Sequence, residues 1–253
     1  MKTITVTNQK GGAGKTTTAA TLAAGLSLRG YKVLLVDLDP QGNLSYTAGA
    51  ETNRATVLGV LTGEVKARDA IQYTNGGDII PSSKALSGAD AFITDTGKEY
   101  RLKEALESLQ ELYDYCIIDT PPTLGILTVN ALTACNSVII PAQADIYSLQ
   151  GIEQIAETMK PVKKYCNPSL SVMGIVLTRY SSRSVLSREV AELAGQLAAK
   201  LGTKLFKATI RESVTVKEAQ LSRKTLYSYA PKAKVTEDYT ALVAEFLKEE
   251  SKR

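Results

Sequence analysis

Residues 6–17 read Val6-Thr-Asn-Gln-Lys-Gly-Gly-Ala-Gly-Lys-Thr-Thr17. The β-branched run Thr3–Asn8 predicts a short strand, and the run Thr16–Arg29 after the glycines predicts a helix. Glycines let the backbone turn tightly between the two, so that successive N–H groups point inward while the helix N-terminus adds partial positive charge. The stretch therefore predicts a phosphate-binding loop, and a glycine-rich turn that merely starts a helix is the alternative.

A lysine and a hydroxyl complete this loop. Lys15 would reach the β- and γ-phosphates of a nucleotide, and the Thr16 hydroxyl would ligate Mg²⁺. The common spacing GxxxxGK[ST] requires glycine at position 9, where this chain has Gln9, and the chain carries a further lysine at position 10. The residues predicted to bind the nucleotide are Gly11, Gly12, Ala13, Gly14, Lys15, Thr16, Thr17 and, from a later strand, Asp119.

Three carboxylates stand where apolar strands end. Leu34-Leu-Val-Asp-Leu-Asp-Pro40 carries Asp37 and Asp39, and Cys116-Ile-Ile-Asp-Thr-Pro-Pro122 carries Asp119. Ligands of open α/β sheets bind outside the carboxyl ends of the strands, and a triphosphate site needs acids to hold magnesium and to organise the attacking water. Capping of the next helix is the alternative role for each aspartate. The predicted metal-binding residues are Thr16, Asp39 and Asp119.

Short β-branched runs alternate with amphipathic runs of helical length, which is the pattern of βαβ units. Residues 33–36, 116–118 and 138–140 are continuously apolar, as central strands covered on both faces should be. We predict one domain over residues 1–253 with an α/β fold, a doubly wound, mainly parallel sheet with helices on both faces. Residues 42–75 form the least regular segment. The predicted strands are Thr3–Asn8, Lys32–Asp37, Asp78–Pro81, Tyr115–Asp119, Ser137–Pro141, Ser171–Leu177 and Lys204–Ile210, and the predicted helices are Thr16–Arg29, Arg101–Leu112, Leu124–Ala134, Leu149–Tyr165, Ser184–Leu201 and Val235–Glu249.

The composition excludes several classes of protein. Of the 253 residues, 44% are apolar and 22% are charged, which is typical of a globular protein. No run approaches the roughly 18 apolar residues of a membrane span, and the N-terminus lacks the apolar stretch of a signal peptide, so we expect a cytoplasmic protein. The chain has no histidine, which excludes His-based triads and most zinc sites. Its three cysteines include no CxxC pair, which favours reduced core thiols.

Three motifs resemble, in order and spacing, those of the ParA/Soj/MinD group of deviant Walker-A ATPases, over nearly the whole chain. They are Lys10-Gly-Gly-Ala-Gly-Lys-Thr16, Asp37-Leu-Asp-Pro-Gln-Gly-Asn43 and Ile118-Asp-Thr-Pro-Pro122. The resemblance implies the P-loop NTPase fold, ATP and Mg²⁺ as ligands, and ATP hydrolysis.

The same resemblance implies roles for individual residues. Lys10 would be the signature lysine, which crosses a dimer interface to the phosphates in the partner's site. Asp39 would orient the attacking water, and Asp119 would be the Walker-B acid. The catalytic residues are then Lys10, Lys15 and Asp39.

Within this group the chain resembles the short ParA proteins. That resemblance implies a homodimer formed with ATP, sequence-independent binding to double-stranded DNA on the nucleoid, and hydrolysis stimulated by a ParB-type centromere-binding protein. The phosphate loop begins so early that we expect no operator-reading domain before it. Residues 179–234 carry 12 basic against 4 acidic residues, which suits a polyanionic partner, although solvated surface charges are the ordinary alternative. The predicted DNA-binding residues are Arg179, Arg183, Arg188, Lys217, Arg223 and Lys224.

Two other functions stay open. A MinD-like ATPase that cycles on a membrane would anchor through a basic amphipathic helix at its C-terminus. Residues 235–249 have an apolar face, but the polar side carries several acids, which favours a helix docked on the core over a membrane anchor. A nucleotide-gated adaptor with little turnover would not depend on Asp39. Iron–sulfur relatives of the same fold need bridging cysteines, which the loop after Asp119 lacks.

Overall fold

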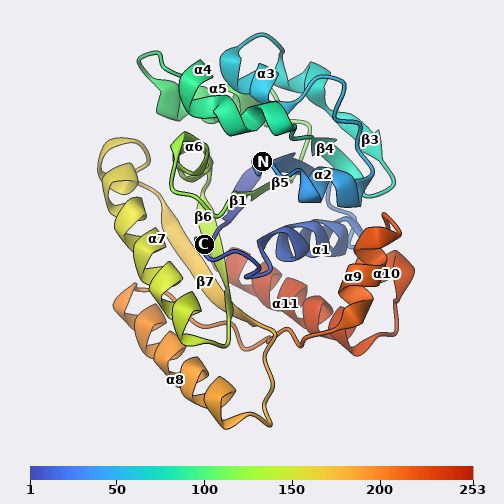
Figure 1. Ribbon diagram of the computed structural model, residues 1–253, viewed down its shortest axis with the longest axis vertical. Coiled ribbons are helices and arrows are strands. Elements are labelled where there is room, and N and C mark those ends of the chain that lie inside the picture. Colours follow the sequence, from blue (N-terminus) through green and yellow to red (C-terminus); the bar gives the residue numbers. More distant parts are fainter. Residues whose placement is uncertain (253) are drawn as a thin grey trace.

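The computed structural model describes residues 1–252, so that Arg253, the last residue of the predicted domain, lies outside them. Within this range the chain forms one seven-stranded sheet in the order β3-β4-β2-β5-β1-β6-β7 (Figure 1). Neighbouring strands are parallel except for β3 and β4 at one edge. The strands are β1 (Lys2–Val6), β2 (Val33–Asp37), β3 (Gln72–Thr74), β4 (Gly77–Ile80), β5 (Tyr115–Asp119), β6 (Ser137–Gln143) and β7 (Ser171–Thr178).

Helices cover both faces of this sheet (Figure 1). Because successive side chains of a strand point to opposite faces, Leu35 of β2 joins one core cluster with α1 and α11, while Leu34 and Val36 join another with α3, α5 and α6. A third cluster lies between β6, β7, α7 and α8. The sheet is therefore doubly wound, as predicted. The helices are α1 (Lys15–Ser27), α2 (Asn43–Ala48), α3 (Val57–Thr62), α4 (Ala89–Phe92), α5 (Arg101–Glu107), α6 (Ile126–Ala134), α7 (Ile146–Tyr165), α8 (Val185–Lys200), α9 (Val214–Leu221), α10 (Leu226–Tyr229) and α11 (Lys234–Glu250), with 3-10 turns at Ala67–Ala70, Lys84–Gly88 and Lys98–Tyr100.

The strand register places the carboxyl ends of β1, β2 and β5 side by side at one edge of the sheet. β2 and β5 are buried along their whole lengths, and their pairing sets Asp37 opposite Asp119. On the other side of β5, Val6 of β1 is also opposite Asp119. The loop that follows β1 and the carboxylates that end β2 and β5 therefore meet at one edge.

The C-terminal helix α11 packs on α1. Its apolar residues Tyr239, Leu242, Val243 and Phe246 are all buried. A Cβ on Gly25 of α1 would lie 2.7 Å from Val243 Cγ2, so that only glycine permits this close approach of the two helices. The apolar face at 235–249 is thus a core face, as its acidic polar side indicated. No helix in residues 1–252 is long and apolar enough to cross a membrane.

The strand predicted at Lys204–Ile210 is wrong. This segment runs beside β7 but forms only isolated bridges there, Ile175 with Leu205 and Thr178 with Ile210. Between the bridges the backbone N–H groups of Lys207 and Ala208 turn away and donate to the Glu245 carboxylate of α11, at 3.1 and 3.0 Å. A side chain far along the sequence therefore takes the hydrogen bonds that a ladder would have used.

Several short elements lie where no regular structure was predicted. The segment 42–75 forms α2, α3 and β3, and the basic region adds α9 and α10. β3 is a three-residue antiparallel edge strand, too short to show a periodic pattern. Helix ends also differ from the prediction. α5 ends at Glu107, five residues before the predicted end at Leu112. α7 begins three residues earlier than predicted, where Asp145 accepts a hydrogen bond from Ser148 N at 3.0 Å and caps the helix.

Candidate functional site

The loop between β1 and α1 has the backbone that its glycines predict. Gly12 and Gly14 adopt left-handed conformations with φ of 75° and 91°, which other residues adopt only at a cost. A Cβ on Gly14 would also lie 3.3 Å from the Thr178 methyl group. Gly11 differs, since its φ is not positive and nothing lies within 4 Å of an added Cβ. The backbone therefore needs glycine at 12 and 14 but not at 11.

Three polar side chains anchor this loop to the ends of neighbouring strands. Asn8 Nδ2 donates to Pro141 O at 2.7 Å, and Asn8 Oδ1 accepts from Lys10 N at 3.0 Å. Gln143 Nε2 donates to Gly12 O at 2.5 Å. Thr178 Oγ1 donates to Ala13 O at 2.9 Å. Sequence reasoning missed these anchors, because each partner is more than 130 residues away and no local pattern marks the contact.

Asp119 lies beside this loop with both carboxylate oxygens buried and without a hydrogen-bond partner. Burial raises the pKa of Asp119 well above its ordinary value, and the nearby Asp37 carboxylate raises it further, while Thr16 and Lys15 oppose the shift. Asp39 is also buried, and its Oδ1 accepts from Gln41 N at 3.0 Å. The register thus brings Asp39 and Asp119 to the loop, as predicted.

Asp37 differs from Asp39 and Asp119 because its carboxylate holds the first turn of α2. Its Oδ2 accepts hydrogen bonds from Ser45 N at 2.8 Å and Ser45 Oγ at 2.7 Å, and its Oδ1 accepts from Asp39 N at 3.1 Å. Burial raises the pKa of Asp37 to about 6, against the lowering effect of the Ser45 hydrogen bonds. These contacts occupy both oxygens, so Asp37 holds α2 in place and orients the loop that carries Asp39.

Lys15 is 6% exposed, and its ammonium donates to Lys10 O at 3.3 Å. Burial lowers the pKa of Lys15, while the negative charges of Asp119 and Asp39 raise it. A buried ammonium and an unpartnered buried carboxylate are both costly without a ligand. Their position beside the glycine-rich loop at the N-terminus of α1 fits an anionic ligand with a bound cation.

The donors available to a cation at this site are oxygen atoms, which Mg²⁺ prefers. They are the Thr16 hydroxyl and the carboxylates of Asp39 and Asp119. Among residues 1–252, no group of three His, Cys, Asp or Glu side chains is close enough to hold a metal ion by protein ligands alone. This fits Mg²⁺, which binds one or two protein ligands and completes its shell with phosphate oxygens and water.

Lys10 points away from the phosphate loop of its own chain. Its ammonium forms an ion pair with Asp145 and donates to Gln143 Oε1 at 3.3 Å. Burial alone would raise the pKa of Asp145, but hydrogen bonds from Lys10 and from Ser148 N lower it overall. Lys10 is thus held on the rim of the loop by Gln143, the last residue of β6, and by Asp145 just after it, separate from the buried Lys15.

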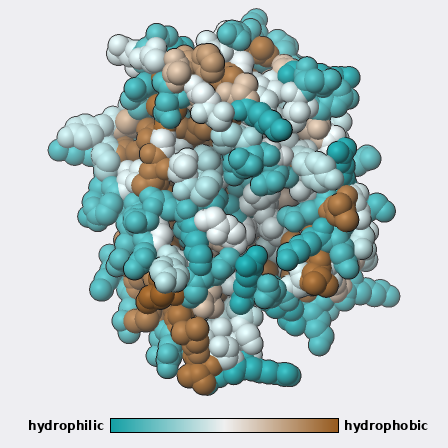
Figure 2. Space-filling model, in the orientation of Figure 1, coloured by the Kyte–Doolittle hydropathy of each residue, from teal (hydrophilic) through white to brown (hydrophobic). Residues whose placement is uncertain are grey.

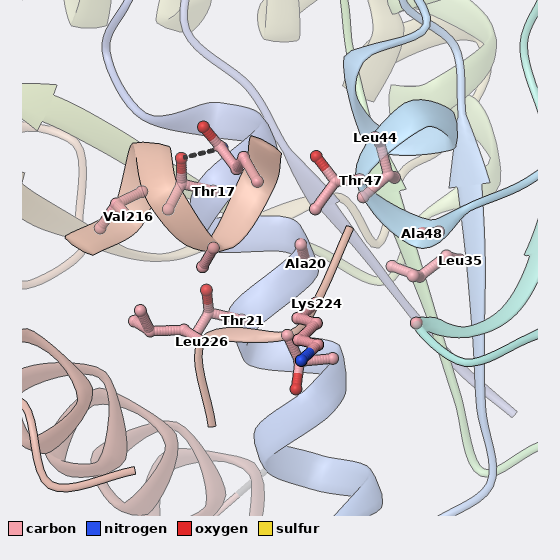
Figure 3. A pocket seen from close by; sticks show the side chains of 14 residues that line it. Thr17, Ala20, Thr21, Leu35, Leu44, Thr47, Ala48, Val216, Lys224 and Leu226 are labelled. Carbon is pink, nitrogen blue, oxygen red and sulfur yellow. Dashed lines mark hydrogen bonds between the residues drawn. The ribbon is translucent and has the colours of Figure 1, made fainter. Parts of the chain in front are cut away.

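A cleft with a volume of about 390 Å³ opens above the loop. Two of the residues predicted to bind DNA, Arg179 and Lys217, line this cleft. Thr17, at its base, accepts a hydrogen bond from Gln220 Nε2 of α9 at 3.2 Å (Figure 3). The lining residues on the loop side are Gly11, Gly12, Gly14, Lys15, Thr16, Thr17, Asp39, Gln41 and Asn43, and those opposite include Thr178, Arg179, Ile210, Arg211, Glu212, Ser213, Val216, Lys217 and Gln220.

The other predicted DNA-binding residues lie elsewhere. Arg188 lies in the first turn of α8 and Arg183 just before its N-cap Ser184, where α8 packs on β7 at one edge of the sheet. Arg223 and Lys224 form the turn between α9 and α10, near β3 at the other edge (Figure 1). The six basic residues are therefore distributed over three surfaces.

Comparison with known proteins places the chain in a family. The family model described as "AAA domain" matches residues 1–172, and that of "4Fe-4S iron sulfur cluster binding proteins, NifH/frxC family" matches residues 101–253. Cys116 and Cys135 are buried, however, and Cys166 is partly buried at the end of α7. The described residues therefore contain no cysteine cluster that could hold iron and sulfur.

Individual relatives match almost end to end. The sporulation initiation inhibitor protein Soj of Bacillus subtilis is 40% identical, over 96% of this chain and 97% of that protein. The chromosome partitioning protein ParA of Caulobacter vibrioides is 38% identical, over 100% and 96%. Cobyrinic acid a,c-diamide synthase of Mycobacterium smegmatis, solved with a bound ATP analog and magnesium, is 34% identical with a TM-score of 0.86, over 100% of this chain and 97% of that one. The chain belongs to the Soj/ParA family of P-loop partitioning ATPases.

Proposed function

We propose that the chain binds ATP with Mg²⁺ in this cleft and hydrolyses it as the switch of a DNA-partition system. One observation carries the proposal most directly. Asp119 has two buried, unpartnered oxygens beside the buried Lys15 ammonium, at a loop whose glycines have the required left-handed backbone. The bound ATP analog and magnesium in the related M. smegmatis structure support the same ligands here.

The residues divide the chemistry between them. Backbone N–H groups of residues 11–17 and the Lys15 ammonium hold the terminal phosphates, and Lys15 stabilises negative charge that develops during transfer. The Thr16 hydroxyl would bind Mg²⁺, and Asp119 would hold the ion through a water. When bound, Mg²⁺ would neutralise negative charge on the phosphates. Asp39 accepts a hydrogen bond from the attacking water and orients it in line with the γ-phosphate.

The dimer supplies a second lysine. We propose that two ATP-bound chains meet at their cleft faces, and that Lys10 leaves Asp145 to contact the phosphates in the partner's site. Because that charge arrives only when two loaded subunits meet, nucleotide state controls self-association. The ion pair of Lys10 with Asp145, outside the residues that line the cleft, supports a role in trans.

We propose double-stranded DNA and a ParB-type protein as the partners. The relatives named as chromosome partitioning proteins and the basic excess in residues 179–234 support this assignment. The ATP dimer would bind duplex DNA of the nucleoid without sequence preference, and the partner protein would stimulate hydrolysis. The membrane-cycling alternative loses support, since the apolar residues of α11 that would enter a bilayer are buried on the core.

Size-exclusion chromatography of Asp39→Ala tests the switch. The variant should form a dimer with ATP but not with ADP, and this dimer should co-elute with duplex DNA at low salt. A monomer under all conditions would refute the contribution of Lys10 in trans. The adaptor alternative predicts equal ATPase rates for Asp39→Ala and the wild type, whereas our assignment predicts a large loss of turnover.

A further inference from the structure

A groove with a volume of about 460 Å³ lies at the amino ends of β2 and β4. Because these strands are parallel, both begin at the edge of the sheet opposite the nucleotide cleft, which lies at the carboxyl ends. The end of α1, the 3-10 turn Ala67–Ala70 and the residues just before β5 complete the walls. We call it the amino-edge groove. None of its lining residues lines the nucleotide cleft.

Three tyrosines line the amino-edge groove, and the structure holds two of them in place. Tyr31 packs edge-on against Tyr115 of β5, with ring centres 5.2 Å apart. Tyr113 is 8% exposed, and its hydroxyl donates to Asp78 Oδ2 at 2.9 Å. The third tyrosine, Tyr73 of β3, is 77% exposed. Rings that are fixed before a ligand arrives lose little conformational freedom on binding, so they favour association.

The unpaired charges of the amino-edge groove are positive. Lys32 and Arg68 line it, and neither forms an ion pair within residues 1–252. The carboxylate of the lining, Asp78, already accepts the hydrogen bond from Tyr113. Burial raises the pKa of Tyr113, and Asp78 raises it further, so the phenol keeps its proton and remains a donor. The groove therefore offers two cations to a ligand and attracts an acidic group.

Exposed apolar side chains adjoin these charges. Leu112 lines the groove and is 37% exposed, and Leu28, next to the lining residue Ser27, is 68% exposed. Exposed apolar side chains also gather over the start of α8, at the lower left of Figure 2, where Val185 is 60% exposed. In the amino-edge groove, apolar surface occurs together with tyrosines and free cations. Contact surfaces between proteins are enriched in tyrosine and arginine, so this combination indicates a protein ligand.

We propose that the amino-edge groove binds an acidic peptide segment of a partner protein, with a large apolar side chain against the tyrosines and carboxylates at Lys32 and Arg68. Duplex DNA fits this surface less well, because an extended polyanion needs a row of cations. Here Asp78 lies inside the groove, and Asp114, whose carboxylate accepts from Lys32 N at 2.8 Å, lies beside it. Binding at this edge leaves the nucleotide cleft free, so the partner stays attached in both the ATP and the ADP state.

The test is a selection of phage-displayed random dodecapeptides on the full chain, followed by fluorescence anisotropy of the selected peptides after synthesis. They should carry acidic residues beside a leucine or an aromatic residue. Arg68→Glu should bind them roughly five- to tenfold more weakly than the wild type, because like charges replace an exposed ion pair. Tyr73→Ala should weaken binding roughly fivefold or more, as expected for an interface tyrosine. Arg183→Glu is the matched control, because it reverses the same charge just before α8, and it should bind the peptides normally.

Further measurements separate a peptide contact from a structural role. Peptide affinity should be equal without nucleotide, with ADP and with ATP, and loss of the peptide on addition of ATP would refute attachment in both states. Arg68 and Tyr73 are exposed, so Tm should not change, and if Tyr73→Ala lowers it, Lys32→Glu takes its place. Selected peptides without acids, or with wild-type affinity for the groove variants, would overturn the proposal. Weaker duplex binding by Arg68→Glu, with normal peptide binding, would assign the groove to DNA instead. Each of these failures leaves the proposed ATPase function intact.

Discussion

At the carboxyl edge of the sheet, residues from three strands converge on one cleft, whereas the basic residues of 179–234 spread over three surfaces. The convergence follows from strand pairing, which sets Val6 and Asp37 opposite Asp119. Dispersal follows from helix packing, which turns Arg183 toward one edge of the molecule and Arg223 toward the other. A sequence motif therefore locates a site when backbone pairing fixes its neighbours, while a charge excess alone does not locate a surface.

The largest effect should come from the buried lysine of the convergent region. Lys15→Met removes the ammonium that contacts the transferred phosphate, and kcat/KM for ATP should fall roughly 10²- to 10³-fold. Folding should not suffer, because an apolar side chain of similar length replaces a buried charge. Steady-state ATPase assays measure the loss of turnover, and urea unfolding without nucleotide measures stability. The exposed Lys160→Met is the control and should retain activity, and normal turnover in Lys15→Met would contradict the site.

The rim lysine should behave differently from the buried one. Lys10→Ala leaves the loop and Lys15 in place, so the monomer should still bind nucleotide, while ATP-dependent dimerisation is lost and turnover falls on the order of 10²-fold. Nucleotide titration followed by size-exclusion chromatography separates these outcomes. Equal loss of nucleotide affinity in Lys10→Ala and Lys15→Met would show that both lysines act within one subunit.

The loop, the strand-end acids and the doubly wound sheet could be predicted because each depends on short-range patterns. An apolar run that ends in an acid, as at Asp119, places the carboxylate at the ligand-binding edge once the strands are parallel. The anchoring hydrogen bonds of Asn8, Gln143 and Thr178 could not be predicted, because each joins residues more than 130 positions apart and leaves no local sequence pattern. The strand-end pattern alone does not separate Asp37 from Asp39. The family resemblance assigned a catalytic role to Asp39 only, and the contacts of Asp37 with Ser45 show what Asp37 does instead.

The path of residues 204–210 beside β7 can be tested through Glu245, which accepts hydrogen bonds from the backbone of this segment. Glu245→Gln weakens the acceptor for the N–H groups of Lys207 and Ala208 and removes the charge that pairs with Lys204. Unfolding free energy at pH 7 should fall by about 1–2 kcal/mol, because hydrogen bonds to a charged acceptor are stronger than those to the neutral amide that replaces it. Urea unfolding measures the loss, and Glu189→Gln on the exposed side of α8 should leave stability unchanged.

The pH dependence of this loss has a definite sign. Burial alone would raise the pKa of Glu245, but hydrogen bonds from Ala208 N and Lys207 N and the charge of Lys204 lower it below its ordinary value of 4.5. A carboxylate with a lowered folded pKa stabilises the protein above its unfolded pKa, and the contribution disappears as pH falls through the folded pKa. The difference between wild type and Glu245→Gln should therefore be full at pH 7 and shrink below about pH 4.5. A difference that persists at pH 3 would mean that packing, not charge, holds the segment.

The smallest effect concerns the contact that holds Lys10 on the rim before two subunits meet. Asp145→Asn keeps a side chain that can cap α7 but removes the charge paired with Lys10. Freeing the lysine should strengthen ATP-dependent dimerisation by about two- to fivefold, the range for a partly exposed ion pair. Analytical ultracentrifugation with ATP in an Asp39→Ala background measures the dimer Kd. Weaker dimerisation would instead mean that Asp145 itself serves the interface, so that Lys10 and Asp145 act together across it rather than in opposition.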